Sequence, residues 1–396
     1  MKTKIASILF SIFILFGCIS NLRGLAQAFS ENDYQKENSK AKEIYHNFQN
    51  CRATIDSYYT NNIKNKTAYI DLCGLALRLC GIRVVDDAEY RVVKLDDGHL
   101  SFVIPEKADI SYPIAQTKKL ADYLKEREIP FLYVQAPYKV CKENPALPAG
   151  VIDYSNEIAD EFVEEMRNYG IDTIDLRERI HEQGIEHHSL FYKTDHHWTP
   201  EAGIWATGEI AEELHKKYGF TVNEKSIDIN DYSCKIYNNW MLGSLGRRTG
   251  IGYAGVEDFR LYLPKDTTPM KYIIRDNNRT INIDFSKESF DPYFLEKNYH
   301  NRSTYCCYTA GDYTHTELYN EADQTGQSLM LIRESFGTVV SPFLGLSCER
   351  LDTVDLRYEG SQAKPFIDEM EPDYVVLMYN PNTLTSNKAF DFILDE

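Results

Sequence analysis

Apolar runs of strand length alternate with amphipathic segments of helical length, and this alternation limits the possible folds more than any other feature of the chain. The predicted strands are Pro130–Pro137, Ile171–Leu176, Ser328–Ile332, Arg350–Leu356 and Tyr374–Met378. The predicted helices are Ile114–Arg127, Asn156–Tyr169, Glu201–Tyr218, 336–346 and Gln362–Met370. Short runs that are apolar throughout are typical of strands buried on both faces. Strands separated by helices indicate an α/β protein with a parallel sheet and right-handed crossovers.

A long segment over residues 220–325 interrupts this alternation. It is rich in Tyr, Asn and Asp, and Phe259–Leu263 and Lys271–Ile274 alternate in the manner of strands. We interpret it as an inserted β-rich subdomain or lid. Residues 30–70 are polar and predict a solvated spacer. The folded domain would then occupy residues 71–396, which is long enough to bury a full core.

The first 29 residues resemble an export signal. Lys2 and Lys4 precede an apolar run from Ile5 to Ile19. Three outcomes fit this segment: cleavage after Ala26-Gln27-Ala28, lipidation at Cys18 in a weak lipoprotein box, or retention as a membrane anchor. All three predict an extracytoplasmic protein, either secreted or anchored through its N-terminal segment.

Composition excludes one class of function and leaves another open. The formal net charge is −17 and no basic stripe is visible, which argues against a nucleic-acid binder. The 28 tyrosines suit core packing, or flat surfaces on which sugar rings stack.

The segment Asp195-His196-His197-Trp198 places an acid and two imidazoles just ahead of the helix that Thr199 and Pro200 begin. In an extended segment Asp195 and His197 share one face and His196 points to the other. A carboxylate beside an imidazole can orient the ring and stabilise its protonated form. We therefore predict that His197 is a general base and that Asp195 orients it. His196, on the other face, is predicted to be a packed residue that supports the site. Trp198 is predicted to lie in the core or a pocket wall, with a stacking platform as the alternative.

Ser335 is the candidate nucleophile. It follows the strand Ser328–Ile332 and precedes a helix, so its hydroxyl is expected at the carboxyl edge of the sheet. A serine hydroxyl needs a base within hydrogen-bond reach, and His197 can supply it. The other interpretation of Ser335 is a helix N-cap.

At this point the chain resembles a known group. Asp195-His196-His197-Trp198 followed by Thr-Pro, with a later strand–Ser335–helix turn, resembles the DHHW family. That family belongs to the SGNH-hydrolase-like proteins of alginate O-acetyltransferase type (AlgX/AlgJ). The resemblance implies a three-layer, flavodoxin-like parallel sheet that is circularly permuted, because Asp195 and His197 precede Ser335. It also implies a Ser335–His197–Asp195 triad, with Glu334 where an Asp is usual.

Several residues are candidates for an oxyanion or substrate site. They are the backbone N–H groups of Ser335 and Phe336, the side chain of Asn380 after the last strand, a backbone donor at Gly243 or Ser244, and the guanidinium of Arg247. Asn380 also fits an ordinary turn, and Arg247 also fits pairing with one of the many carboxylates. Gln135, Tyr138 and Lys139 follow a strand at the same edge, as pocket lining or as a polar loop.

No metal or cofactor is predicted. His181, His187 and His188 show no HExxH or regular i, i+4 spacing, and adjacent histidines point apart. Outside the leader the chain has eight cysteines, an even number that allows disulfides in an exported protein, but their pairing does not follow from the sequence.

These features predict an exported serine-dependent O-acetyltransferase that acts on a polysaccharide or oligosaccharide through an acetyl-serine. The resemblance implies that a membrane-bound O-acyltransferase partner supplies the acetyl groups. Two alternatives remain: a carbohydrate O-acetylesterase with the same triad, and a non-catalytic glycan-binding or scaffold protein.

Overall fold

The computed structural model describes residues 40, 47–52, 54, 65–86, 90–358 and 362–392. The predicted leader over residues 1–29 and most of the predicted spacer lie outside these residues. Residues 73–396 form one compact unit. Among the described residues, no helix has both the length and the apolar character needed to cross a membrane.

The main sheet has eight strands in the order β5-β4-β13-β11-β12-β10-β8-β9. The first five strands in this order are parallel to one another. Their bounds are Asp172–Asp175, Phe131–Gln135, Tyr374–Tyr379, Ser328–Arg333 and Arg350–Val354. These are the five strands expected from the apolar runs, so the predicted parallel sheet is confirmed.

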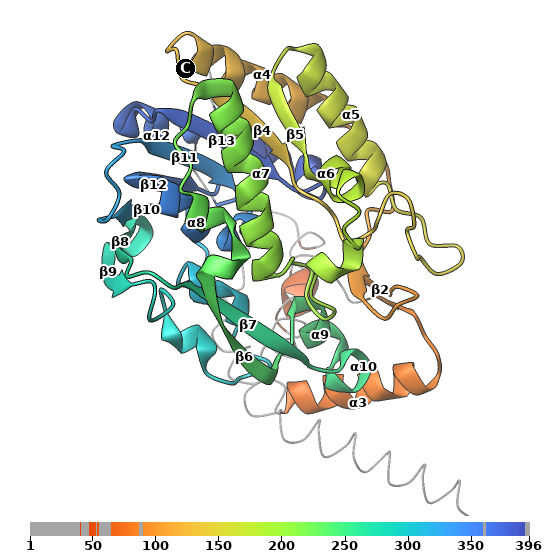
Figure 1. Cartoon of the computed structure of the whole chain (residues 1–396). Coiled ribbons are helices and arrows are strands. Elements are labelled where there is room, and N and C mark those ends of the chain that lie inside the picture. Colours follow the sequence, from red (N-terminus) through yellow and green to blue (C-terminus); the bar gives the residue numbers. More distant parts are fainter. Residues whose placement is uncertain are drawn as a thin grey trace, which may run out of the picture. The chain divides into compact units, whose positions relative to one another are not determined.

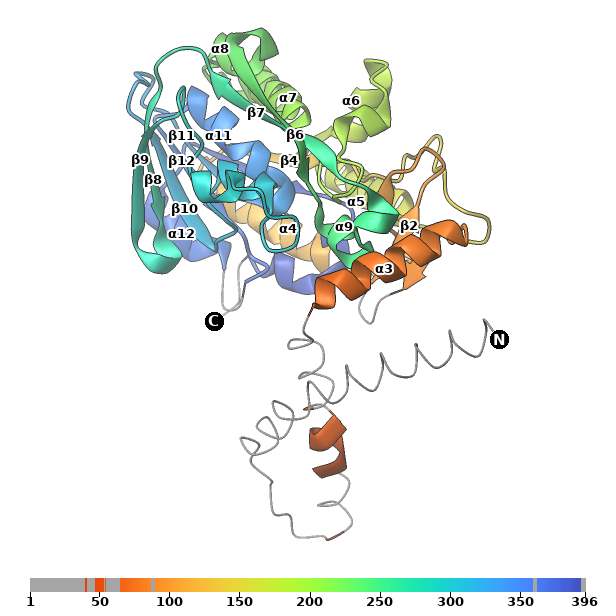
Figure 2. The ribbon, with the colours of Figure 1, turned by 90° about the horizontal axis from the view of Figure 1, so that it is seen from below.

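Helices cover both faces of this sheet, and Figures 1 and 2 show α7 and α4 on opposite sides of it. One core holds residues of α6, α7 and α11, and the other holds residues of α4, α5 and α12. The bounds are α4 Ser111–Lys125, α5 Ser155–Asn168, α6 Leu176–Glu182, α7 Pro200–Tyr218, α11 Ser341–Leu344 and α12 Ala363–Met370. The arrangement is the three-layer α/β/α fold that the sequence predicted.

The strands supply both cores because successive side chains point to opposite faces. In β4, Leu132 and Val134 enter the core under α7, whereas Phe131 and Tyr133 enter the core under α4 and α5. All five residues of this strand are buried. That is why its sequence is apolar from Phe131 to Val134 instead of alternating.

The strands of the segment 220–325 do not form one separate β subdomain. Here β10, β8 and β9 continue the main sheet beyond β12, each antiparallel to its neighbour. Only β6 and β7 form a ribbon of their own. The bounds are β6 Tyr232–Met241, β7 Glu257–Pro264, β8 Pro269–Ile274, β9 Arg279–Asp284 and β10 His315–Asn320. Because Leu318 and Tyr272 are buried in the core under α7, the segment completes the central fold.

Smaller elements complete the description. A three-stranded sheet comprises β1 Val84–Asp86, β2 Arg91–Lys94 and β3 Leu100–Phe102. The remaining α-helices are α3 Lys66–Leu79, α8 Glu224–Ile227, α9 Ser244–Thr249 and α10 Ile251–Ala254. Short 3-10 helices occupy His187–Leu190, Ile229–Asp231, Arg275–Asn277, Pro292–Leu295, Thr304–Tyr308, Ser335–Val339, Gly345–Ser347, Thr383–Thr385 and Asn387–Phe390.

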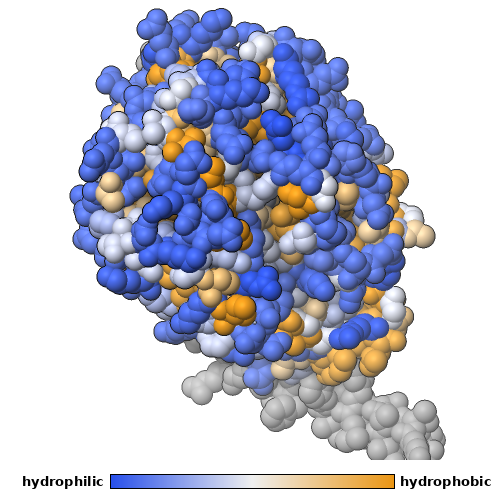
Figure 3. Space-filling model, in the orientation of Figure 1, coloured by the Kyte–Doolittle hydropathy of each residue, from blue (hydrophilic) through white to orange (hydrophobic). Residues whose placement is uncertain are grey.

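One face of the molecule is largely hydrophilic in Figure 3, with hydrophobic residues gathered near α3. Leu75 and Leu79 of that helix are 43% and 79% exposed. Within residues 73–392 the described cysteines, Cys73, Cys80, Cys141, Cys234, Cys306, Cys307 and Cys348, are free thiols, so none of the disulfides that the sequence allowed has formed between them.

Candidate active site

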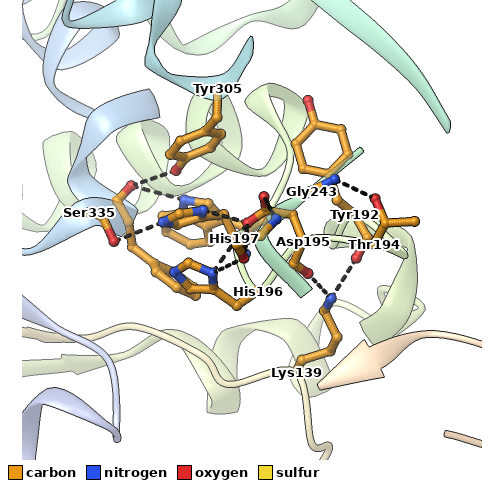
Figure 4. Close-up of polar contacts among 12 residues, drawn as sticks. Lys139, Tyr192, Thr194, Asp195, His196, His197, Gly243, Tyr305 and Ser335 are labelled. Carbon is orange, nitrogen blue, oxygen red and sulfur yellow. Dashed lines mark hydrogen bonds and ion pairs between the residues drawn. The ribbon is translucent and has the colours of Figure 1, made fainter. Parts of the chain in front are cut away.

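Ser335, His197 and Asp195 meet at the carboxyl edge of the parallel strands (Figure 4). Ser335 lies two residues after β11. Its Oγ is 2.8 Å from Nε2 of His197, and Nδ1 of His197 is 2.6 Å from Oδ1 of Asp195. All three side chains are buried. The structure therefore forms the serine–histidine contact that the sequence led us to expect across 138 positions.

The loop that carries Asp195 and His197 is held closed by backbone contacts. Phe191 and Trp198 form an isolated antiparallel bridge, and the N–H of Thr199 donates to the carbonyl of Leu190 at 2.8 Å. Thr199 then caps α7 through its side chain, which accepts from the N–H of Ala202, as expected. The predicted N-cap and proline start of this helix are therefore present.

The curvature of this loop corrects our expectation for His196, which was placed on the face opposite Asp195 and His197. The ring centroids of His196 and His197 are only 3.7 Å apart, and Nδ1 of His196 lies 3.3 Å from Oδ1 of Asp195. The alternation of faces holds for an extended strand, whereas residues 193–197 are bent. Both imidazoles therefore lie beside one carboxylate.

The start of α9 holds Asp195 in place. The N–H of Ser244 donates to Oδ2 of Asp195 at 2.8 Å, and the N–H of Gly243 donates to Oγ1 of Thr194 at 2.8 Å. These two N–H groups were candidate oxyanion donors, and that expectation is wrong because both are occupied by the loop. The N–H of Ser244 instead orients the carboxylate of Asp195, and the N–H of Gly243 holds the neighbouring Thr194.

Asp195 stays ionised although it is buried. Burial disfavours its charged form, but the charges of His197, His196 and Arg247 and the hydrogen bond from His197 hold its pKa well below the ordinary value. An ionised Asp195 can stabilise a protonated His197. Arg247 contributes through its charge, while its Nη1 donates to the carbonyls of Leu242 at 3.0 Å and Arg302 at 3.4 Å.

Lys139 is a further residue that holds the loop, and it is almost fully buried. Its ammonium donates to the carbonyls of Leu100 at 2.8 Å and Tyr192 at 2.5 Å, and also to the carbonyl of Asp195. The sequence left Lys139 open between pocket lining and polar loop. The structure shows instead a cation that ties three backbone segments together. Burial lowers the pKa of Lys139 to about 8, against the attraction of Glu257, Asp195 and Asp97.

This buried lysine predicts an unusual pH dependence of stability. Between pH 8 and about 10.4 the unfolded chain keeps the lysine proton that the folded chain has released, so stability should rise with pH. The gain from this one group is about 3 kcal/mol over that range. We expect the free energy of unfolding of wild type, measured in urea, to rise relative to that of Lys139→Met between pH 7 and about pH 10. Parallel pH curves would contradict the assignment.

Aromatic rings enclose His197. Tyr305 stacks on its imidazole with ring centroids 4.2 Å apart and an interplanar angle of 11°. Nε1 of Trp198 donates to the carbonyl of Phe336 at 2.9 Å, and the hydroxyl of Tyr305 donates to the same carbonyl at 3.3 Å. Trp198 is fully buried, as the sequence predicted. These contacts fix the imidazole against the turn that carries Ser335.

Of the two oxyanion donors expected at the turn that carries Ser335, the N–H of Phe336 is occupied. The backbone N–H of Phe336 donates to Oε2 of Glu334 at 3.1 Å, so the carboxylate that caps this turn occupies the expected oxyanion donor. The N–H of Ser335 itself donates no hydrogen bond to any of the described residues. Burial raises the pKa of Glu334, and the charge of Arg357 and the N–H of Phe336 oppose this. The N–H of Ser335 is therefore the better placed donor in this structure.

Asn380 follows β13 at the same sheet edge but acts as a turn residue. Its Oδ1 accepts from the N–H groups of Asn382 at 2.8 Å and Thr383 at 3.2 Å. This is the ordinary turn interpretation that the sequence left open. It leaves the amide nitrogen of Asn380 as the part of the side chain that could face a ligand.

This chain is similar to a known protein family in sequence and to solved structures in fold. Residues 101–231 match the family model described as "SGNH hydrolase-like domain, acetyltransferase AlgX". The chain carries an SGNH hydrolase-like domain. The predicted resemblance and the predicted SGNH-hydrolase-like fold are thereby confirmed. The match includes Asp195 and His197 and ends before Ser335.

Solved structures share the fold of this SGNH hydrolase-like domain. PatB1 of Bacillus cereus, solved with a sulfonyl adduct, is 17% identical with a TM-score of 0.62, over 78% of this chain and 98% of PatB1. A DHHW family protein from Eubacterium siraeum is 16% identical with a TM-score of 0.59, over 79% of this chain and 98% of its own. Identities this low show the fold alone. No curated protein matches in sequence.

The sequence analysis missed one residue of this site, gave a second the wrong role and left a third undecided. Tyr305 had no signal beyond a general excess of tyrosine, and Ser244 was assigned to the wrong donor role. Lys139 had one available signal, its position two residues after the predicted strand Pro130–Pro137 at the correct edge. The contacts of these residues are long-range, so no local pattern specifies them.

Proposed function

We propose that this protein is a serine-dependent O-acetyltransferase that passes an acetyl group to a hydroxyl of a polysaccharide or oligosaccharide. The single observation that carries the proposal is the relay Ser335 Oγ–His197 Nε2, 2.8 Å, and His197 Nδ1–Asp195 Oδ1, 2.6 Å. An AlgX-type acetyltransferase match over residues 101–231 supports this class of reaction.

The first half of the reaction forms an acetyl-serine. Oγ of Ser335 attacks the donor carbonyl while its proton moves to Nε2 of His197. Asp195 stabilises the resulting imidazolium through Nδ1–H. The bond between the acetyl carbon and the donor oxygen then breaks, and His197 returns the proton to that oxygen. The N–H of Ser335 is positioned to stabilise the developing oxyanion.

The second half regenerates the serine. An acceptor hydroxyl attacks the acetyl-serine carbonyl and gives its proton to His197. The ester bond to Ser335 breaks, and the same proton passes to Oγ of Ser335. Water in place of the acceptor would give hydrolysis with the same three residues, so acceptor binding decides between transfer and release.

A row of aromatic rings supports a sugar acceptor. The ring centroids of His196 and Phe102 are 5.8 Å apart, and those of Phe102 and Tyr90 are 5.0 Å apart. The guanidinium of Arg248 lies 4.0 Å from the ring centroid of Tyr90. Tyr90 is 39% exposed, so the row leads from the histidine pair to the surface. Flat aromatic faces with a nearby polar group suit a glycan.

Removal of the outer ring provides a test of this acceptor surface. We expect Tyr90→Ala to raise KM for an oligosaccharide acceptor by about tenfold, because a stacking contact is lost, and to leave turnover of a small acetyl ester unchanged. Tyr169→Ala is the matched control, since Tyr169 is a 46% exposed tyrosine at the end of α5. Equal KM values for both variants would show that Tyr90 does not contact the acceptor.

The setting of the reaction is part of the proposal. Lys2 and Lys4 followed by the apolar run to Ile19 support export, with the protein secreted or anchored outside the cytoplasm. A membrane-bound O-acyltransferase is the proposed source of acetyl groups. No nucleic-acid partner is proposed, given the net charge of −17.

Trapping the intermediate and following the acetyl group test the function. With an activated acetyl ester, rapid acid quench and peptide mass spectrometry should find one acetyl group on the peptide containing Ser335. With an oligosaccharide added, the acetyl group should appear on the sugar faster than as free acetate. Release of acetate alone, with every acceptor tried, would make the protein an esterase. An absence of acetylation at Ser335 would overturn the proposal.

A further inference from the structure

A second group of converging side chains lies away from the serine. Asp97 belongs to the turn between β2 and β3, His99 follows it, and His188 lies in the 3-10 helix His187–Leu190. Nδ1 of His99 is 2.8 Å and Nδ1 of His188 is 2.6 Å from the same oxygen, Oδ2 of Asp97. The two rings stack with centroids 5.0 Å apart. Three ligand atoms thus converge on one point.

The hydrogen bond at Nε2 of His188 determines which of its two ring nitrogens carries the proton. Nε2 of His188 lies 3.1 Å from the carbonyl of Lys139, and a carbonyl only accepts, so Nε2 carries the proton. In a neutral His188 of this tautomer, Nδ1 carries no proton and lies 2.6 Å from Oδ2 of Asp97. That contact requires a positive species between the two, either a second proton or a metal ion. A histidine that binds a metal through one nitrogen typically donates the other N–H to a carbonyl.

The surroundings favour a cation. The group opens into a cleft of about 850 Å³ that contains five carboxylates and two basic side chains, namely Asp97, Glu186, Glu201, Glu257, Asp258, Lys193 and Arg260. An acidic cleft concentrates cations and leaves an entry path and room for water ligands. The histidine side chains are only 8% and 11% exposed, whereas that of Asp97 is 39% exposed.

We propose that Asp97, His99 and His188 form a binding site for a divalent transition-metal ion of the zinc type, with an open position for water. Two imidazoles and one carboxylate are ligands that zinc accepts, at about 2.0–2.2 Å. The nitrogen and oxygen atoms, now 2.8 and 2.6 Å apart, must separate to about 3.4 Å to admit a tetrahedral ion. Asp97 can move, because it is partly exposed and precedes Gly98, whose φ of 93° turns the chain.

The position of the site indicates what the ion does. His188 donates to the backbone carbonyl of Lys139, whose ammonium holds the carbonyls of Leu100, Tyr192 and Asp195. Leu100 in turn donates its N–H to the carbonyl of Lys193 at 2.8 Å. A metal ion that joins His99 to His188 would therefore tie the β2–β3 turn to the segment that leads to Asp195. Its role is to stabilise this loop and not to activate the acetyl donor, so the inference is independent of the proposed chemistry.

Metal binding by the whole chain tests the site directly. After treatment with a chelator, equilibrium dialysis against zinc at micromolar concentration should find one ion per chain and a Tm raised by several degrees. The cobalt-loaded protein should show the intense visible absorption of a low-coordinate site with nitrogen ligands. Asp97→Asn and His188→Gln should each weaken binding at least about tenfold. His181→Asn, at an exposed histidine of α6, should bind as wild type does.

Each result supports or overturns the proposal. His99→Asn adds a second test of the ligand set should His188→Gln fail to fold, as judged by circular dichroism. Wild type that binds no zinc, or only the weak absorption of hydrated cobalt, would show that a proton occupies the position between His188 and Asp97. Unchanged affinity in Asp97→Asn and His99→Asn would place the ion elsewhere and overturn the assignment.

Discussion

Ser335→Ala is expected to lower turnover of an acetyl ester by about 10⁴–10⁶-fold, the loss typical of a missing serine nucleophile. The change removes one oxygen, which contacts Nε2 of His197 at 2.8 Å and Oε2 of Glu334 at 3.3 Å. Ser335 is 6% exposed, and alanine fills nearly the same space. Stability should therefore change little while the covalent intermediate is lost. Steady-state turnover and acetyl labelling are the two measurements.

Ser226→Ala is the matched control for this variant. Ser226 is equally buried, and its hydroxyl contacts the carbonyl of Asn223 at 2.7 Å and Oγ of Ser347 at 3.1 Å, outside the candidate site. It should lose some stability and keep full turnover. If Ser335→Ala turns over the ester at the rate of Ser226→Ala, the serine mechanism is wrong and the protein is a non-catalytic member of its fold.

Gly243→Ala is expected to reduce turnover by about 10²–10³-fold, although Gly243 contacts no substrate in the proposed mechanism. A Cβ at Gly243 would lie 2.4 Å from N, Cα and Cβ of Asp195, and real Cβ contacts are essentially never this short. The backbone of Gly243 has φ −69° and ψ 176°, which alanine adopts freely. The effect is thus purely a displacement of Asp195, and a shift of about 1 Å in a catalytic group costs about 10²-fold.

Gly208→Ala controls for the loss of a glycine. Its Cβ would meet Ile227 at 3.6 Å, an ordinary contact, within α7. Alanine in a helix is favoured over glycine by roughly 0.5–1 kcal/mol, so this variant should be at least as stable as wild type and equally active. A Gly243→Ala enzyme with wild-type turnover and an unchanged hydrogen bond from His197 to Asp195 would show that the loop accommodates the Cβ without displacing the acid, and the prediction would be wrong.

The structure of the parallel strands followed from local sequence. Runs such as 131–135 are apolar on both faces because helices cover both faces of the sheet, and the run alone reports this. The antiparallel strands β8, β9 and β10 were harder to assign. Their partners lie on a sheet edge whose identity depends on β12, more than 30 residues away from β10. We therefore mistook a continuation of the sheet for a separate subdomain.

The residues of the candidate site likewise divide into those that local sequence could place and those that it could not. Ser335 could be placed because a serine between a buried strand and a helix lies at the carboxyl edge, and Asp195 and His197 because they precede a capped helix. The backbone donors that hold this loop could not be placed, since Ser244 reaches Asp195, and Gly243 reaches Thr194, only through the loop before α9. His196 was misplaced because a bent segment does not keep the alternation of a strand.

By itself, the sequence determined the layered α/β fold, the strands of its parallel part and the serine, histidine and acid that face one another. These follow from hydrophobic periodicity and from residue types at strand and helix ends, which are local properties of the chain. Only the tertiary structure decided that Lys139 holds the acid's loop, that Tyr305 stacks on His197, and that His99 and His188 share one oxygen of Asp97. Such contacts join segments far apart in the chain, and their geometry depends on how the whole core packs.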